Sequence, residues 1–204
     1  MKRNKYIIGI TGSIATGKSV ATNYLQKKGY QVLDADHLAH MVLEQDNVLE
    51  KLRSTFGSTI FNGKKLSREK LGRIIFQSES EKEKLSKIVH PKVYQMIQKE
   101  IDTSCEEIIF LDIPLLIENL VENKNYGLKF DEIWLIYIPV ELQLQRLIKR
   151  DQISKDYALS KINSQIDIED KKKYATVIFD NSRTEKDLEI AISNELCRLK
   201  EEIL

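Results

Sequence analysis

The feature that most constrains this chain is an eight-residue run near its start, Gly12-Ser13-Ile14-Ala15-Thr16-Gly17-Lys18-Ser19. It matches the pattern G-x-x-x-x-G-K-[ST] without a gap. Glycines let such a loop wrap closely around phosphates, and successive backbone N–H groups at the start of the next helix face the anion. We therefore predict that this run, here called the P-loop, binds the phosphates of a nucleoside triphosphate. In that role Lys18 reaches the β- and γ-phosphates, and the Ser19 hydroxyl ligates Mg²⁺.

The residues on both sides of the P-loop fit this role. Tyr6–Thr11 is a short apolar run that ends at Gly12 and predicts a buried strand. Val20 and Leu25 then follow a helical period up to Gly29. The alternative is a chance match in a glycine-containing turn. It is weak because the chain has only 8 Gly and because the required order of strand, loop and helix is present.

The rest of the chain alternates between short apolar runs and helical periods. Four further runs predict strands: Gln31–Asp34, Ile108–Ile113, Glu132–Ile138 and Thr176–Phe179. Three late segments predict helices: Val140–Arg150, Lys155–Gln165 and Glu185–Glu202. Such alternation predicts an α/β fold of three layers, in which a five-stranded parallel sheet is covered by helices on both faces.

Residues from about 37 to about 100 show a different pattern, helical throughout and without strand-like alternation. Breaks in this pattern fall at Asp46-Asn47, at 57–63, at Gln77-Ser78 and near Pro91. We interpret the segment as a helical insertion in the α/β fold.

Composition excludes several classes of protein. Lys and Arg number 32 against 31 Asp and Glu, and this balance argues against a general nucleic-acid binder. No apolar run approaches the length of a membrane span, and the apolar run after the basic residues 2–5 is too short for a signal peptide. The two cysteines, Cys105 and Cys197, are far apart and indicate reduced thiols. We expect a cytoplasmic protein without a nucleic-acid or membrane partner.

Three missing patterns narrow the classes that share a P-loop. The nearest match to a guanine-binding Asn-Lys-x-Asp is Asn123-Lys124-Asn125-Tyr126, which lacks the acid. No Asp is followed three residues later by Gly, as the phosphate sensor of a GTPase switch would be. The Leu-Ser-Gly-Gly-Gln segment of a transporter ATPase is also missing. A compact kinase remains.

Carboxylates follow two of the predicted strands. Asp34-Ala35-Asp36 follows the second strand, and the P-loop reaches the same edge of a parallel sheet. Two carboxylates there can orient an acceptor hydroxyl, accept its proton and help hold Mg²⁺, although either can instead cap the next helix. Asp112 ends the third strand and is a second candidate for the metal. The division of base and metal roles between Asp36 and Asp112 stays open. His37 and His40 lack a third ligand, so we favour histidines of the surface or of a pocket wall over a metal site.

These features together resemble the dephospho-CoA kinase family from end to end. The P-loop at the N-terminus and Asp34-Ala35-Asp36 fit its pattern. The other matching segments follow in order: Phe56-Gly57, Leu66 with Arg68 and Leu71, His90-Pro91, Pro114-Leu115-Leu116-Ile117-Glu118, Gln145-Arg146-Leu147, Arg150-Asp151, Gln165, and Asp180-Asn181-Ser182. Ser13 and Ala15 stand where the family usually has Gly, Thr16 where it often has Ser, and Ser67 and Thr176 where Asp is common.

The resemblance implies transfer of a phosphoryl group from ATP to the ribose 3′-hydroxyl of dephospho-CoA, which gives coenzyme A and ADP. Asp36 would orient that hydroxyl and accept its proton, while Lys18 and Mg²⁺ neutralise the transferred group. Arg146 and Arg150 lie one helical turn apart and would clamp the phosphates as part of a lid. Taken alone, the arginine pair would indicate a solvated helix face, as the run Lys171-Lys172-Lys173 does.

The resemblance also implies an acceptor site and a set of subdomains. Arg68 and His90 would face the acceptor pocket, although a helix break with a capping histidine is nearly as good an explanation of His90. The remaining implied contacts come from the segment after the third strand and from the last turn: Pro114, Leu115 and Leu116 as walls, Glu118 on an arginine or lysine or as a helix cap, and Asn181 near the adenine.

By the same resemblance, the core comprises about 1–36, 100–139 and 174–204. A CoA-binding insertion comprises about 37–99, and the lid about 140–173. We expect a monomer or a weak homo-oligomer. A nucleoside or nucleotide kinase on the same scaffold and a non-catalytic nucleotide sensor remain as alternatives.

Overall fold

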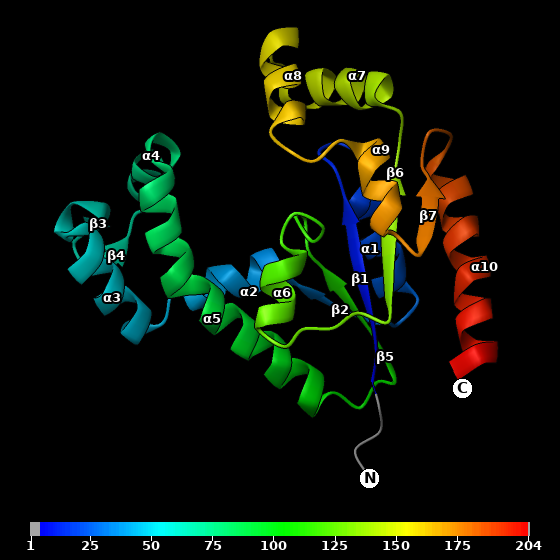
Figure 1. The fold of residues 1–204 in the computed structure, drawn as a ribbon, viewed down its shortest axis with the longest axis horizontal. Helices are drawn as coiled ribbons and strands as arrows, with labels where there is room; N and C mark the ends of the chain where they lie inside the picture. The colour runs from blue at the N-terminus through cyan, green and yellow to red at the C-terminus, as the bar shows by residue number, and fades with distance from the viewer. Residues whose placement is uncertain (1–4, 204) are drawn as a thin grey trace. The chain divides into compact units, whose positions relative to one another are not determined.

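The structure is a computed structural model that describes residues 5–203, and it divides into two compact units (Figure 1). The first, here called the core unit, comprises Met1–Leu33 and Cys105–Leu204 as far as these are described. The second, here called the helical unit, comprises Asp34–Ser104. Each unit is described by itself below.

The core unit is built on a five-stranded sheet. Its strands are β1 (Tyr6–Gly12), β2 (Gln31–Asp34), β5 (Ile108–Asp112), β6 (Glu132–Tyr137) and β7 (Val177–Asp180). They lie in the order β2-β5-β1-β6-β7, and β1 pairs in parallel with both β5 and β6, as β6 does with β7. The predicted strands and the parallel sheet are therefore confirmed, with ends that differ by about one residue.

The central position of β1 decides where a ligand can bind. Ile10 of β1 is in register with Asp112 of β5 and with Trp134 of β6. Because later strands lie on both sides of β1, its carboxyl end is a switch point in strand order, where open α/β sheets bind ligands. The P-loop leaves β1 at this point, and Asp112 arrives at the same edge.

Helices cover both faces of this sheet because side chains along each strand alternate between the faces. Ile8 and Ile10 point to the face that packs against α1 (Lys18–Lys27) and α10 (Glu185–Ile203). On the other face, Gly9 lies against Leu116 and Phe130, so that a β-carbon at position 9 would overlap the Leu116 side chain. The other helices of the core unit are α6 (Leu120–Asn125), α7 (Val140–Asp151), α8 (Lys155–Asn163), α9 (Ile168–Lys171) and the 3-10 turn η2 (Lys172–Tyr174).

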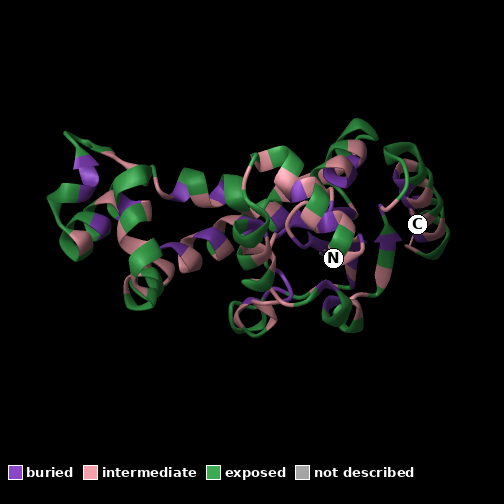
Figure 2. Cartoon of the chain, turned by 90° about the horizontal axis from the view of Figure 1, so that it is seen from above, coloured by how far each residue is buried: buried purple, intermediate pink, exposed green. Residues whose placement is uncertain are grey.

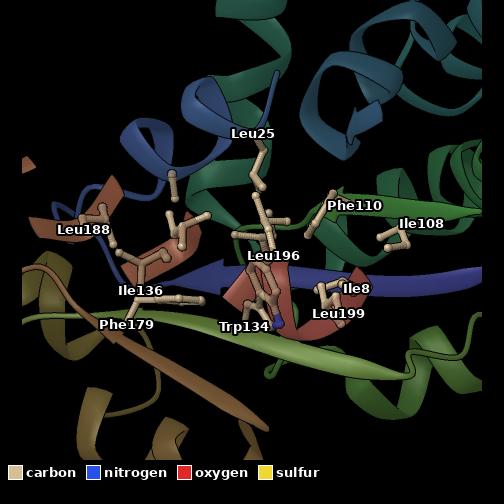
Figure 3. Packing of buried hydrophobic residues seen from close by; sticks show 13 residues of the cluster. Ile8, Leu25, Ile108, Phe110, Trp134, Ile136, Phe179, Leu188, Leu196 and Leu199 are labelled. Atoms are coloured by element: carbon tan, nitrogen blue, oxygen red, sulfur yellow. The ribbon is translucent and has the colours of Figure 1, made fainter. Parts of the chain in front are cut away.

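Three aromatic rings form the centre of the core on the α1/α10 face (Figure 3). The Trp134 ring lies 5.1 Å from that of Phe110 and 4.9 Å from that of Phe179, measured between centroids. Trp134 is completely buried, and its Nε1–H donates a 2.7 Å hydrogen bond to Glu132 Oε2. The indole therefore buries its large apolar surface without leaving its one polar hydrogen unpaired.

The helical unit packs its shorter helices against one long helix, α5 (Glu79–Thr103). These are α2 (Ala35–Val42), α3 (Asp46–Phe56) and α4 (Arg68–Gln77). Buried and exposed residues alternate along the helices of both units, as expected for helices with one apolar face (Figure 2). Between α3 and α4 lie the turn η1 (Ser58–Ile60) and a small antiparallel pair, β3 (Phe61–Asn62) with β4 (Lys65–Leu66).

The helical pattern of this segment is confirmed, but the position of one break and a small hairpin differ from the prediction. The breaks at 57–63 and at Gln77-Ser78 are present, whereas the break expected at Asp46-Asn47 lies just before α3. The β3–β4 hairpin was not predicted, because two residues a strand are too few to show alternation.

The break expected near Pro91 is wrong, because α5 runs through this proline. A proline inside a helix costs about 3 kcal/mol through the lost hydrogen bond and the ring clash. Four residues of α5 are buried on both sides of Pro91: Val89, Val93, Ile97 and Ile101. Packing of this face outweighs the local cost. Within residues 5–203, no helix combines the length and the apolarity needed to cross a bilayer.

Candidate active site

A cavity of about 650 Å³ opens at the carboxyl end of β1, entirely within the core unit. Residues 12–20 line one side of it, and the other lining residues are Pro114, Arg146, Arg150, Gln165, Asn181, Arg183 and Glu185. The structure therefore brings the predicted phosphate loop, both lid arginines and Asn181 to one cavity. A cavity of this size is within the usual range for small-molecule sites.

The two glycines of the P-loop are required by its geometry. A β-carbon at Gly12 would overlap the Thr16 hydroxyl, which donates a 2.9 Å hydrogen bond to the Ser13 carbonyl. Gly17 has a φ of 90°, and a β-carbon there would overlap the Asn181 side-chain amide. Side chains at these positions would push the loop away from its supports, so only glycine fits.

Ala15 occupies a conformation that is unusual for alanine. Its φ is 62°, in the left-handed region, where a non-glycine residue costs roughly 1–2 kcal/mol. The backbone at this position therefore has a conformation that glycine adopts more readily than alanine.

Lys18 and Asp112 form a direct ion pair at the edge of the sheet. Their side chains are 20% and 11% exposed, and both groups belong to the same edge as the Ser19 hydroxyl, which is exposed. A hydroxyl and a carboxylate are hard oxygen donors, which fit Mg²⁺, an ion that commonly keeps several waters and binds few protein groups. Residues 5–203 contain no cluster of three or more His, Cys, Asp or Glu arranged for a metal, and a Mg²⁺–nucleotide site does not need one.

Arg146 and Arg150, the two predicted lid arginines, have different partners. Arg146 Nη2 donates a 2.9 Å hydrogen bond to the Asn181 carbonyl. Arg150 Nε lies 2.7 Å from Asp151 Oδ1, and this hydrogen bond raises the pKa of Arg150 and lowers that of Asp151. Both arginines line the same cavity, so their guanidinium groups can neutralise phosphate charge.

Asn181 is 3% exposed and contacts the backbone of the P-loop. Its Nδ2 donates a 2.8 Å hydrogen bond to the Thr16 carbonyl, and its backbone N–H donates to the Tyr137 carbonyl at 2.8 Å. The side-chain amide is thus engaged with the loop. A contact of Asn181 with adenine stays a prediction.

Glu118 binds a lysine, one of the two alternatives that the sequence left open. Its Oε1 lies 2.7 Å from Lys171 Nζ and accepts a hydrogen bond from the Ile166 N–H at 3.3 Å. The expectation that the run Lys171-Lys172-Lys173 is solvated is wrong for Lys171, which is completely buried. Lys171 ends α9, where the Glu118 carboxylate compensates its charge.

The segment after β5 contributes two further predicted residues. Pro114 lines the cavity, and its carbonyl accepts a 3.1 Å hydrogen bond from the Thr11 hydroxyl. Leu115 is 40% exposed, whereas Leu116 is fully buried against Gly9 in the core. An acceptor role for Pro114 and Leu115 stays a prediction, while the surroundings of Leu116 are those of a core residue.

Asp34, which ends β2, and Asp36 belong to the helical unit. Asp34 is the N-cap of α2, and its Oδ1 accepts a 3.0 Å hydrogen bond from the His37 N–H. Asp36 lies in the first turn of α2 and is exposed. The helix thus starts at Ala35 rather than His37, and Asp34 performs the capping that the sequence allowed for either residue.

The other acceptor residues of the resemblance also belong to the helical unit. Arg68 lines a second cavity of about 400 Å³ together with Lys64 and Lys65, and its Nη2 lies 3.2 Å from Glu44 Oε1. His90 lies inside α5 with its ring edge-on to Tyr94, so the alternative of a capping histidine at a helix break is wrong.

Several residues that touch the site were missed as site residues by the sequence analysis, among them Glu185, which lines the cavity. Arg183 lines the cavity beside Asn181. Gln143 and Gln165 hydrogen-bond the P-loop backbone. Gln165 was among the segments that match the family, but no role was assigned to it. Gln143 belongs to no motif, so the sequence did not mark it as a site residue.

Comparison with known proteins gives matches along almost the whole chain. The family model described as dephospho-CoA kinase matches residues 6–187. The dephospho-CoA kinase of Streptococcus mutans is 40% identical over 200 residues, which cover 96% of this chain and 98% of the relative. That of Bacillus licheniformis is 39% identical over 188 residues, with 90% and 91% covered. The solved dephospho-CoA kinase from Campylobacter jejuni has a TM-score of 0.74 at 29% identity and covers 98% of this chain and 100% of its own. Since the matched motifs and the P-loop cavity fall within these alignments, the chain belongs to the dephospho-CoA kinase family.

Proposed function

We propose that this chain transfers the γ-phosphoryl group of ATP to the ribose 3′-hydroxyl of dephospho-CoA, the final step in making coenzyme A. The observation that carries the proposal is the cavity in which the P-loop, Lys18 and two lid arginines converge, in a chain of this family. This arrangement supplies positive charge on several sides of a bound triphosphate, as phosphoryl transfer requires.

The donor half of the site uses groups of the core unit. Lys18 exchanges Asp112 for oxygens of the β- and γ-phosphates when nucleotide binds, which frees the Asp112 carboxylate. Ser19 and, through water, Asp112 would hold Mg²⁺, which supplies neutralising charge on the phosphates when bound. Arg146 and Arg150 bind the transferred group from the lid side and exclude water, so that ATP is not hydrolysed without an acceptor.

The acceptor half depends on Asp36. Its carboxylate accepts the proton of the 3′-hydroxyl as the oxygen forms its bond to the γ-phosphorus, and the bond from that phosphorus to the ADP oxygen breaks. Asp34 is engaged in capping α2, whereas the Asp36 carboxylate has no hydrogen-bond partner within residues 5–203. This difference favours Asp36 over Asp34 as the base.

The remaining assignments follow the same proposal. Arg68, His90, Pro114, Leu115 and Glu118 contact the acceptor, with Arg68 in a basic cavity suited to an anionic group. The enzyme works in the cytoplasm as a monomer or weak homo-oligomer and has no nucleic-acid or membrane partner.

A coupled assay of ADP release tests the proposal against its rivals. Release that depends on dephospho-CoA and Mg²⁺ supports it. Release that depends instead on a nucleoside or nucleotide would overturn the acceptor assignment. Nucleotide binding without turnover on any of these acceptors would identify a sensor.

A further inference from the structure

Two glutamines bind the backbone of a single P-loop residue, Ile14. The Ile14 N–H donates a 2.9 Å hydrogen bond to Gln165 Oε1. Gln143 Nε2 donates a 2.6 Å hydrogen bond to the Ile14 carbonyl. We infer that Gln143 and Gln165, here called the glutamine clamp, are positioning residues that hold the P-loop in its phosphate-binding conformation. The inference deepens the proposed function, because it concerns the binding of ATP at that site.

The clamp fixes two successive peptide groups. The Ile14 N–H belongs to the peptide before Ile14, and the Ile14 carbonyl belongs to the peptide that leads into Ala15. In a trans peptide the C=O and N–H point in opposite directions. Since the Ile14 carbonyl points to Gln143, the Ala15 N–H points away from Gln143, and Ala15 lines the phosphate cavity. The Ile14 N–H, by contrast, is already used by Gln165.

The conformation of Ala15 shows why the loop needs this support. Its φ of 62° is unfavourable for alanine, and such a conformation persists only where the surroundings determine it. Without the clamp, the peptide between Ile14 and Ala15 could rotate toward an ordinary right-handed conformation. The Ala15 N–H would then turn out of the cavity, and the loop would lose a donor for phosphate.

The chemistry of the two positions requires amides of defined orientation. Gln165 supplies an acceptor and Gln143 a donor, and Gln143 is 1% exposed with its Oε1 unpaired within the described residues. A glutamate at 143 would present two acceptors to the Ile14 carbonyl. A methionine at either position keeps the length of the side chain and removes the hydrogen bond.

The clamp also joins the lid to the loop. Gln143 lies on α7 one turn before Arg146, which bonds the Asn181 carbonyl, and Gln165 lies between α8 and α9. The clamp therefore ties two parts of the lid segment, α7 and the α8–α9 link, to the donor loop.

The test compares Gln143→Met and Gln165→Met with wild type and with Gln26→Met, an exposed glutamine on α1. ATP and ADP binding are measured directly by calorimetry, and KM for each substrate by the coupled assay. Each clamp variant should weaken nucleotide binding by on the order of 3–10-fold, the usual worth of one hydrogen bond, while KM for the acceptor changes by less than about twofold. Gln26→Met should bind like wild type. Equal nucleotide affinity in wild type and both clamp variants would overturn the inference.

Ala15→Gly provides the second arm, because glycine adopts the left-handed conformation without support. Combined with Gln143→Met, it should recover part of the lost affinity, whereas a simple loss of packing would not be repaired there. The clamp would also be overturned if Gln143→Met melts like wild type but the double variant with Ala15→Gly binds ATP no better than Gln143→Met alone. Failure of the proposed function is distinguishable, since wild type would then bind ATP without turning over dephospho-CoA.

Discussion

The ammonium group of Lys171 lies 2.7 Å from Glu118 Oε1, and the lysine side chain is completely buried. The pair joins the end of α9 to the segment that follows β5. Two charges removed from water in this way compensate each other, but the removal of one leaves the other buried and unpaired.

We therefore expect Lys171→Met to lower the free energy of unfolding by about 3 kcal/mol or more. Lys173→Met, which alters an exposed lysine in an exposed ion pair with Asp170, should change it by less than about 0.5 kcal/mol. Urea unfolding of both variants measures these differences. The double variant Lys171→Met, Glu118→Leu should recover much of the loss. A single Lys171→Met protein as stable as wild type would contradict the prediction.

Asp36→Asn should bind ATP normally and lose most of its turnover, because help from a general base is typically worth about 10²–10⁴-fold. The measurements are kcat in the coupled assay and the ATP dissociation constant. Asp46→Asn, at the exposed start of α3 in the same unit, is the matched control and should keep its activity. Near-normal turnover in Asp36→Asn would move the base assignment to Asp34 or Asp112.

Gly17→Ala should weaken ATP binding by roughly tenfold or more, because its φ of 90° is strained for alanine and its β-carbon would overlap Asn181. Calorimetric titration with ATP measures the loss. Gly72→Ala is the control, since Gly72 lies inside α4 with open space around it and alanine there should stabilise the helix by about 0.5–1 kcal/mol. Unchanged ATP affinity in Gly17→Ala would be incompatible with the described loop.

Alkaline pH should destabilise the core unit through Tyr6. Burial, together with the nearby Glu132 carboxylate, raises the pKa of Tyr6 to about 12 from 10.0, and the Tyr6 hydroxyl donates a 3.1 Å hydrogen bond to Glu132. Below pH 10 both the folded and the unfolded chain hold the phenol proton. As pH rises from 10 toward 12, only the unfolded chain loses it, so the free energy of unfolding falls.

Urea unfolding of wild type and Tyr6→Phe, from about pH 8 to about pH 11, measures this effect. The stability advantage of wild type over Tyr6→Phe should be constant in the lower part of the range and shrink above pH 10. An advantage that grows with pH would have the wrong sign for a raised pKa.

The sheet and the phosphate loop were predictable because their signals are local. A continuous apolar run such as Ile108–Leu111 is typical of a strand that is buried on both faces of a sheet. The P-loop pattern requires a strand before it and a helix after it. Burial of Lys171 was not predictable, because three consecutive lysines usually face solvent and the compensating Glu118 is fifty-three positions away in the sequence. Continuation of α5 through Pro91 was hidden for a similar reason. It depends on packing with α2, α3 and α4, which a local pattern does not contain.

The site was predicted in part. The P-loop motif identifies the loop residues by itself. Helical spacing predicts that Arg146 and Arg150 share one face of a helix, and both side chains line the cavity. Gln143 could not be found in this way, because a glutamine that bonds a backbone carbonyl 129 residues away has no sequence pattern of its own. Neutral side chains that hold backbone groups are set by the folded geometry alone.

Trp134 is the only tryptophan in the chain, and its ring lies at the centre of the core-unit sheet between Phe110 and Phe179. Its fluorescence is therefore a built-in optical reporter of one unit, while circular dichroism sums the helices of both. If the two signals change at different urea concentrations, the units unfold in separate steps. A ligand can then be assigned to the unit whose unfolding step it shifts to higher urea concentration. ATP should delay the fluorescence change, and a ligand held by the helical unit alone should delay only the dichroism change.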